Sequence, residues 1–302
     1  MKRRFKFESS VSEYLKRFMK GGDAQQEAPA EIAPGAGGDV KPEKTETAVP
    51  ETDAKSEAPE AEDRPQSVLC HADTNVGRVR ATNQDALLIG EMLWGVADGM
   101  GGHKGGETAS AGARDGMLEL LSGKTPAIDT LREAVETVNS RLFEQQKQDE
   151  KLSGMGTTLT ALWFSEHYVY IAQVGDSRAY RMRKGKLEQL TQDHSLVAEL
   201  VRAGVLTPEQ AADHPMRNVI TRAVGTEETV DVDVIVEERE KDDLWLVCSD
   251  GLYGMVEDSA MEAILSVNTP EASVKLLIDA AMASGGHDNI SVVILRDKEG
   301  GR

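Results

Sequence analysis

Hydrophobic and polar positions recur with two different periods from Gln66 onward. Segments rich in Val, Ile, Leu, Thr and aromatic residues predict β-strands at 92–97, 157–164, 167–174, 178–183, 230–236, 243–249 and 290–295. Apolar residues spaced three and four apart predict helices at 105–121, 127–147, 194–203, 258–266 and 270–284. Several strands follow one another in mid-chain while long helices stand between others. This order favours an α+β fold of antiparallel sheets covered by helices over a strictly alternating parallel sheet.

The first 66 residues differ in character from the rest of the chain. Residues 1–20 carry seven Lys and Arg against two acidic residues. Their apolar residues, including Phe7, Val11 and Phe18, fall at helical spacing and predict a short basic amphipathic helix. This helix either docks to a partner or an anionic membrane surface, or is a frayed tail. Residues 21–66 are rich in Ala, Pro and Glu and predict a disordered acidic linker, because they cannot bury enough surface to offset their ordering entropy.

Composition and charge exclude several function classes. The 302 residues carry 34 Lys and Arg against 52 Asp and Glu, a formal net charge of −18. Nucleic-acid binding needs a basic surface that releases counterions, so we expect no nucleic-acid partner. No apolar run approaches the roughly 18 residues that span a bilayer. The two cysteines, Cys70 and Cys248, form no zinc or disulfide motif, and we therefore expect a reducing, cytoplasmic location.

Four acidic residues stand next to apolar segments: Asp98 and Asp250 follow predicted strands, Asp288 lies just ahead of one, and Asp85 precedes the apolar residues 86–89. Carboxylates at strand ends suit a hard cation, because Mg²⁺ and Mn²⁺ prefer oxygen ligands. Gly99 follows Asp98, and a glycine lets a backbone carbonyl approach a metal without a Cβ in the way. Each Asp-Gly pair taken alone is more typical of a hairpin turn. The combination favours a metal site, because the segment at 98–103 is too rich in glycine for an ordinary tight turn.

Seven short motifs follow one another in an order that resembles a known enzyme family. They are RATNQD at 80–85, DGMGGH at 98–103, GTT at 156–158, VGDSRAY at 174–180, TQDHS at 191–195, SDGL at 249–252 and GHDN at 286–289. The set is similar to the bacterial branch of the metal-dependent protein phosphatases, the PPM or type 2C serine/threonine phosphatases. The resemblance covers about residues 67–297, with a flap insertion at about 193–225, and leaves a tail at 298–302. It implies an αββα sandwich of two antiparallel sheets flanked by helices.

The resemblance also implies a binuclear Mn²⁺ or Mg²⁺ centre and a role for each matching residue. Asp98 would bridge both ions, with the Gly99 carbonyl on one of them. Asp250 and Asp288 would complete the shell of the first ion, and Asp85 would serve the second ion. Asp176 would help to hold a third, weaker ion. Arg80 matches the arginine that binds the substrate phosphate, which suits a planar and permanently charged guanidinium.

The implied activity is hydrolysis of phosphoserine and phosphothreonine on proteins, the products of a Ser/Thr kinase pathway. Metal-bound water or hydroxide would attack phosphorus directly, without a phosphoenzyme intermediate. Met100 stands where animal members carry a His, so either His103 or a metal-bound water protonates the leaving group. Gln84 stands where many members carry Glu, so the second ion would rely more on Asp85.

Two other functions remain open on the same fold. A catalytically silent phosphoprotein-binding regulator would show degenerate ligand positions, and the five implied Asp ligands are all intact. An enzyme acting on small phosphate esters or nucleotides would keep the metals and differ in substrate. In the flap, Arg217 and Arg222 either contact acidic phosphoproteins or form ordinary surface ion pairs. His194 is expected to shape a loop through hydrogen bonds.

Overall fold

The structure is a computed structural model that describes residues 67–101 and 105–301. The chain divides into two compact units, Met1–Pro65 and Gln66–Arg302, and all described residues belong to the second. The helix predicted at 1–20, the linker predicted at 21–66 and His103 lie outside the described residues. Within the described ranges, no helix has the length and apolar character needed to cross a membrane.

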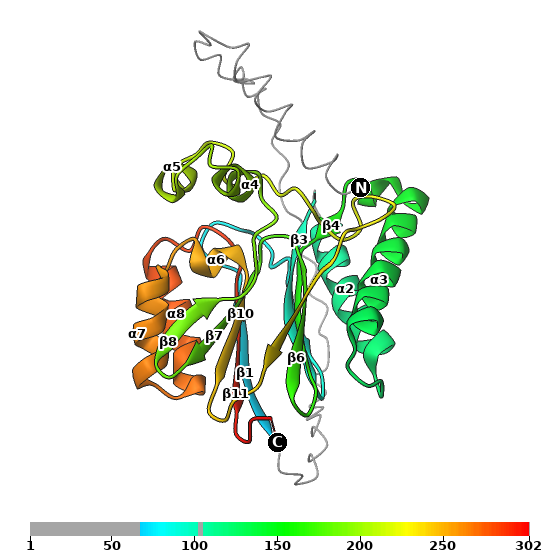
Figure 1. Ribbon diagram of the computed structural model, residues 1–302. Helices are drawn as coiled ribbons and strands as arrows, with labels where there is room; N and C mark the ends of the chain where they lie inside the picture. Colours follow the sequence, from blue (N-terminus) through cyan, green and yellow to red (C-terminus); the bar gives the residue numbers. More distant parts are fainter. Residues whose placement is uncertain (1–66, 102–104, 302) are drawn as a thin grey trace, which may run out of the picture. The chain divides into compact units, whose positions relative to one another are not determined.

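Two antiparallel sheets form the centre of the second unit (Figure 1). One sheet has the strand order β1-β11-β10-β7-β8, and the other runs β2-β3-β5-β6-β9 with β4 paired to β3. The strands are β1 (Val68–Asn75), β2 (Asp85–Ile89), β3 (Leu93–Met100), β4 (Gly156–Thr157), β5 (Leu159–Phe164), β6 (Tyr168–Val174), β7 (Arg178–Arg183), β8 (Lys186–Gln189), β9 (Asp233–Glu238), β10 (Leu244–Cys248) and β11 (Ile290–Asp297).

Helices cover the outer face of each sheet (Figure 1). Helices α2 and α3 pack on the sheet that contains β3, and α7 and α8 pack on the sheet that contains β10. The helices are α2 (Gly105–Leu121), α3 (Ile128–Gln148), the 3₁₀ helix η1 (Glu150–Leu152), α4 (Leu196–Arg202), α5 (Pro208–Ala212), α6 (Asp250–Tyr253), α7 (Asp258–Val267) and α8 (Pro270–Ala283). The predicted αββα sandwich is confirmed.

Strand β10 shows how the sequence pattern builds the layers. Trp245 and Val247 point into the core between the two sheets, whereas Leu246 and Cys248 point into the core beneath α7 and α8. Because successive side chains of a strand face opposite ways, a strand that is buried on both faces is apolar throughout. The continuous apolar segment therefore marks an internal strand, which places the residue that follows it, Asp250, at the edge of a buried sheet.

Some elements differ from the sequence prediction. The strand expected at 157–164 divides into β4 and β5, because Thr158 donates its amide hydrogen to the Asp98 carbonyl at 2.8 Å while Thr157 pairs with Val224. The strand expected at 230–236 begins three residues later, at β9. Asp250 does not simply end a strand, because it is the first residue of α6. Two of these departures involve Asp98 and Asp250, which the sequence singled out.

Strands β1, β2 and β8 and helices α5 and α6 have no counterpart among the elements predicted from the sequence. β8 is a short and mostly exposed polar strand, so its sequence lacks the apolar residues that predict a strand. It forms because Lys184 and Gly185 both adopt positive φ, at 53° and 80°, and close a hairpin with β7. Two residues with positive φ are typical of the tight turns that match the twist of paired strands.

Candidate metal centre and phosphate site

Asp85 and Asp98 lie directly opposite each other on neighbouring strands, β2 and β3. The Asp85 carboxylate is oriented by two hydroxyl groups, since Ser249 Oγ and Ser291 Oγ donate to its Oδ2 at 2.8 and 2.6 Å. Its other oxygen, Oδ1, is buried and has no hydrogen-bond partner within the described residues. One side of this carboxylate is therefore fixed by the protein while the other side faces its acidic neighbours.

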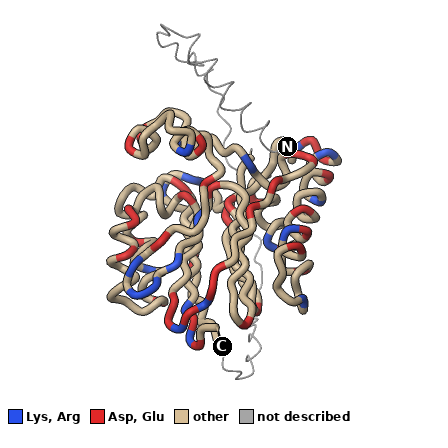
Figure 2. Tube along the Cα trace, in the orientation of Figure 1, with Lys and Arg blue, Asp and Glu red and all other residues tan. Residues whose placement is uncertain are grey.

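Two further acids reach the same place from the other sheet. Asp250 follows β10, and Asp288 lies two residues before β11, the neighbour of β10. The Asp98 carboxyl lies close enough to those of Asp85 and Asp250 to share a hydrogen bond with each when one partner is protonated. Asp250 Oδ1 is buried and, like Asp85 Oδ1, unpaired among the described residues. Figure 2 shows acidic positions between the two sheets at the end nearest α4.

Burial and mutual repulsion set the charge state of this cluster. Burial, together with the charges of Asp85 and Asp250, raises the pKa of Asp98 well above its usual value. Burial raises the pKa of Asp250 to about 7, with the charges of Asp176 and Asp288 adding to the effect. Buried carboxylates are stable only when they are protonated, paired or bound to a cation. The donor set, oxygen atoms from several acids, suits a hard divalent cation.

The oxygen donors of the acidic cluster suit a divalent cation. However, their side chains are not already arranged as a coordination shell. Among the described residues, no three His, Cys, Asp or Glu side chains form a ready-made set of metal ligands. The two unpaired carboxylate oxygens, on Asp85 and Asp250, are the observation that favours a cation, because an unpartnered buried oxygen is costly. The ligand roles of the individual residues therefore stay a prediction.

Gly99 brings three backbone segments together beside the acids. A Cβ at this position would lie 2.1 Å from the Gly106 carbonyl oxygen and 2.6 Å from that of Gln84. The Gly99 amide donates to the same Gln84 carbonyl at 3.1 Å. No larger residue fits without moving backbone, so the glycine is required by close packing of β3 against the start of α2.

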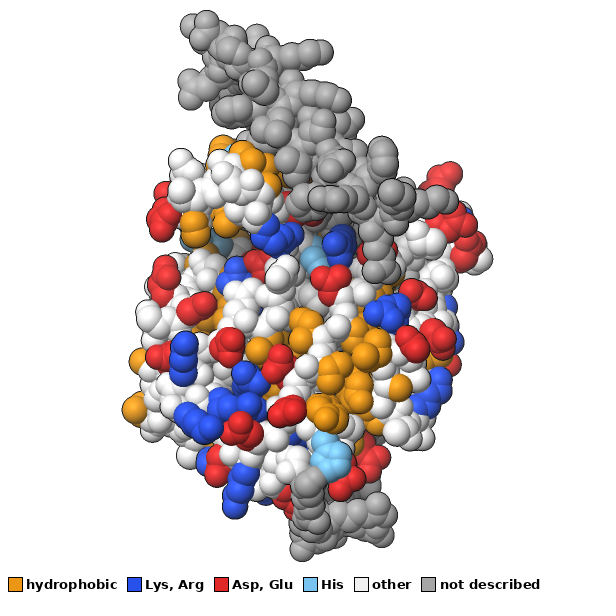
Figure 3. Space-filling model, in the orientation of Figure 1, with side chains coloured by type: hydrophobic (Ala, Val, Ile, Leu, Met, Phe, Trp, Pro, Cys, Tyr) orange, Lys and Arg blue, Asp and Glu red, His pale blue; other side chains and the backbone are white. Residues whose placement is uncertain are grey.

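Arg80 follows a turn, residues 77–79, that packs against the chain around Asp288. Gly77 has φ +79°, and a Cβ there would lie 2.2 Å from the Asp288 carbonyl oxygen. Arg80 Nη2 donates to Asp288 Oδ2 at 2.7 Å, and 51% of the Arg80 side chain is exposed. The guanidinium thus stands at the accessible rim of the acidic cluster, where a phosphoryl group can reach it. Figure 3 shows basic, acidic and His side chains close together below the α4–α5 segment.

Asp176 lies on the turn between β6 and β7, next to the same cluster. Burial and the charge of Asp193 raise its pKa to about 6. Arg178 holds Asp193 through Nε and Nη2, at 3.0 and 2.7 Å to its two oxygens, and stacks on the Tyr253 ring at 3.6 Å from the ring centroid. Since Asp176 also repels Asp98 and Asp250 electrostatically, it belongs to the edge of the acidic cluster.

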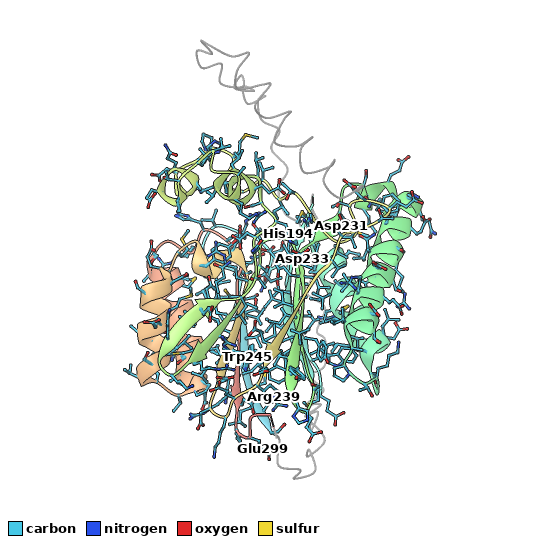
Figure 4. All side chains as sticks on the ribbon, in the orientation of Figure 1. His194, Asp231, Asp233, Arg239, Trp245 and Glu299 are labelled. Atoms are coloured by element: carbon cyan, nitrogen blue, oxygen red, sulfur yellow. The ribbon has the colours of Figure 1, made fainter. Side chains whose placement is uncertain are left out.

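His194 forms hydrogen bonds within the loops around Gly175 and Asp233, and the sequence analysis expected it to shape a loop in this way. Its Nδ1 accepts from the Gly175 amide at 3.1 Å, so Nε2 carries the proton and faces Asp233 Oδ2 at 3.2 Å (Figure 4). Arg222 Nη1 donates to Asp233 Oδ1 at 3.0 Å. The hydrogen bond from His194, with the nearby Arg222 charge, lowers the pKa of Asp233 to about 2. Arg222 is therefore engaged within the protein, in the manner of an ordinary ion pair.

Residues 77–279, which contain most of this site, match the family model described as protein phosphatase 2C. The chain belongs to the protein phosphatase 2C family. The chain is 40% identical over 243 residues to the serine/threonine phosphatase stp of Listeria monocytogenes, covering 74% of this chain and 95% of that protein.

Solved structures of the protein phosphatase 2C family share the fold. The crystal structure of the Mycobacterium tuberculosis serine/threonine phosphatase PstP has a TM-score of 0.73 and 38% identity, and covers 77% of this chain and 99% of that chain. A second structure, the PstP catalytic domain in complex with two manganese ions, has a TM-score of 0.71 and 35% identity, with coverage of 77% and 99%.

Within this protein phosphatase 2C domain, the structure brings together every implied site residue that it describes. Asp85, Asp98, Asp250 and Asp288 meet between the sheets, with Asp176 at the edge of the cluster and Arg80 at its rim. His103 lies outside the described residues, so its role stays a prediction. The Gly99 carbonyl is placed beside the cluster by its strand, β3, and its role as a ligand also stays a prediction.

Sequence reasoning missed the residues that hold the acids in position. Asn289 accepts from the Gln84 amide at 2.8 Å and donates to the carbonyls of Val76 and Thr82 at 2.9 and 3.0 Å, which fixes the segment that carries Arg80. Ser249 and Ser291 orient Asp85, as described above. The sequence could have indicated two of these residues by their position, because Asn289 directly follows Asp288 and Ser249 directly precedes Asp250.

Proposed function

We propose that the chain is a metal-dependent protein serine/threonine phosphatase that hydrolyses phosphoserine and phosphothreonine on proteins. The observation that carries the proposal is the meeting of partly buried carboxylates from both sheets, with buried and unpaired oxygens on Asp85 and Asp250, beside a half-exposed arginine. The names of the relatives and the manganese complex of one of them support the substrate class and the metal. The proposed substrates are proteins that a Ser/Thr kinase has phosphorylated.

Two Mn²⁺ or Mg²⁺ ions are the proposed cofactors, with a third, weaker ion at the edge. Asp98 would serve both ions, Asp250 and Asp288 the first, Asp85 the second and Asp176 the third. The Gly99 carbonyl would be a further ligand. When bound, these ions supply charge neutralisation and an activated water that attacks phosphorus directly, without a phosphoenzyme intermediate. Ser249 and Ser291 would keep Asp85 oriented by bonding to one of its oxygens and leaving the other for a ligand.

The protein's own residues supply the remaining functions. Arg80 is exposed enough to exchange its bond with Asp288 for two bonds to a phosphoryl group, because a guanidinium presents a planar fork of donors. The departing serine or threonine oxygen needs a proton, which comes from His103 or from water in the site. If His103→Ala turns over a phosphopeptide and an activated aryl phosphate at the rates of the unaltered enzyme, water is the source.

The proposal is tested by phosphate release from a phosphothreonine peptide. The purified chain should release phosphate only with Mn²⁺ or Mg²⁺, and Asp98→Asn should lose the activity. Asp279→Asn, an exposed acid on α8 away from the cluster, is the matched control and should keep it. Peptide binding without turnover would instead identify a silent regulator. Higher catalytic efficiency on small phosphate esters than on phosphopeptides would reassign the substrate class.

A further inference from the structure

The turn that precedes the phosphate-binding arginine carries a second arginine, Arg78. The Arg78 amide donates to the Gly286 carbonyl at 2.7 Å, and a Cβ on Gly286 would lie 3.3 Å from Arg78 Cγ. Gly77 on one side and the Arg80–Asp288 bond on the other fix the same turn. The backbone of Arg78 is therefore held in one place relative to the phosphate site, before any substrate arrives.

The side chain of Arg78 is exposed and forms no hydrogen bond or ion pair with the described residues. Ten arginines of the described ranges form ion pairs with acidic side chains, and Arg202 donates to a backbone carbonyl. Arg78 has no side-chain hydrogen bond or ion pair with any described residue, and it shares this property with Arg217 alone among the described arginines. In a chain with a net charge of −18, an unpaired arginine beside the site is a cation available to a ligand.

The two arginines are close enough to contact neighbouring residues of one substrate peptide. Residues 78 and 80 lie two positions apart, so their Cα atoms are separated by at most about 7 Å. A phosphorylated peptide in an extended conformation covers the same distance in two residues. When Arg80 holds the phosphate, Arg78 can therefore meet a side chain one or two residues away. Neighbouring Val79 is 65% exposed, which shows that this turn faces solvent and is accessible to a peptide.

We propose that Arg78 is a specificity determinant that selects phosphoproteins with an acidic side chain within two residues of the phosphorylated Ser or Thr. The inference rests on the proposed phosphatase function. An Arg–carboxylate pair at an exposed rim changes affinity by about three- to fivefold and is weakened by salt. Because the pair forms equally in the bound substrate and in the transition state, its effect falls on KM and leaves kcat almost unchanged.

The test compares two phosphothreonine peptides that differ only by Glu or Gln at the two positions on each side of the phosphothreonine. The unaltered full-length protein, with Mn²⁺, should show a kcat/KM about three- to fivefold higher for the Glu peptide at low salt. Arg78→Ala should lower this ratio to about one without affecting the Gln peptide, and Arg78→Lys should keep part of the ratio. Arg296→Ala removes a half-buried charge, which pairs with Asp242 about 20 Å along β11 from the end of the strand nearest Asp288, and should leave the ratio unchanged.

Normal turnover of the Gln peptide by Arg78→Ala shows that the variant is folded and that the proposed function holds. If the ratio then equals that of the unaltered protein, or if the unaltered protein does not prefer Glu, the role of Arg78 is overturned while the phosphatase function stands. If the unaltered protein hydrolyses neither peptide, the proposed function fails, and the role of Arg78 fails with it.

Discussion

Replacing Asp98 with Asn should stabilise the metal-free protein while it abolishes turnover. Asp98 and Asp85 are cross-strand partners, so their Cβ atoms lie about 5 Å apart. Two like charges at that distance repel each other by about 3 kcal/mol at an effective dielectric constant of 20. Protonation relieves part of this repulsion. We therefore expect Asp98→Asn to gain about 1–3 kcal/mol in EDTA, which raises Tm by roughly 3–10 °C for a domain of this size.

The gain should depend on pH in a defined direction. The pKa of Asp250 is about 7 in the folded protein, above the usual value for an Asp. The folded state therefore binds more protons than the unfolded state, so the stability of the unaltered protein falls as pH rises from about 4 to 7. The advantage of Asp98→Asn should grow over that window and be small at pH 4.

The assay is thermal unfolding in EDTA and then in Mn²⁺, with Asp279→Asn as the control. At 100 times Kd, a bound ion stabilises the unaltered protein by about 2.7 kcal/mol, whereas Asp98→Asn should gain much less. The control should lie within about 0.5 kcal/mol of the unaltered protein in both conditions. The reasoning is refuted if Asp98→Asn is no more stable in EDTA, or if Mn²⁺ raises both Tm values equally.

Three further substitutions test the site and the core. Arg80→Ala should lower kcat/KM for a phosphopeptide by about 100-fold with little change in Tm, because it removes a donor to the phosphoryl group from an exposed position; an unchanged kcat/KM would remove Arg80 from the site. Gly99→Ala should cost about 3 kcal/mol in urea unfolding, because its Cβ would lie 2.1 Å from a carbonyl oxygen. Trp245→Ala should cost about 3–5 kcal/mol in the same assay, since this fully buried ring packs edge-on against Phe164; a loss below 1 kcal/mol would contradict the packed core between the two sheets.

The sequence predicts the internal strands well and the peripheral ones poorly. β10 is apolar at every position because both of its faces are buried, and that pattern is visible in one dimension. β1 runs at the edge of its sheet, where most of its residues, including His71, are half-buried and Asp73 is exposed, so its pattern resembles that of a loop. β8 depends on a turn geometry at Lys184 and Gly185 that composition alone does not reveal.

The acids of the site could be predicted for a different reason. Asp98 and Asp250 are each followed by glycine, and that pair alone is ambiguous between a turn and a ligand. The order of the motifs along the chain resolved the ambiguity. The sequence could not show which oxygen of the Asp85 carboxylate accepts hydrogen bonds and which one is unpaired. Ser291 and Asp85 lie 206 positions apart, and their hydrogen bond is visible only once β2 and β11 are placed in space.

Carboxylates at the two ends of the sandwich have opposite surroundings. Far from the site, Asp297 is fully buried and accepts hydrogen bonds from Arg239 Nε and Nη2 at 2.7 and 2.9 Å and from the Gly300 amide at 2.8 Å; Arg239 is labelled in Figure 4. At the site, Asp98 and Asp250 are partly buried and face other acids. Among the described residues, Arg80 is the one basic side chain that forms an ion pair with an acid of this cluster, and it pairs with Asp288 at the exposed rim. A cluster that costs stability in this way is explained by binding an external cation, and a purely structural role does not explain it.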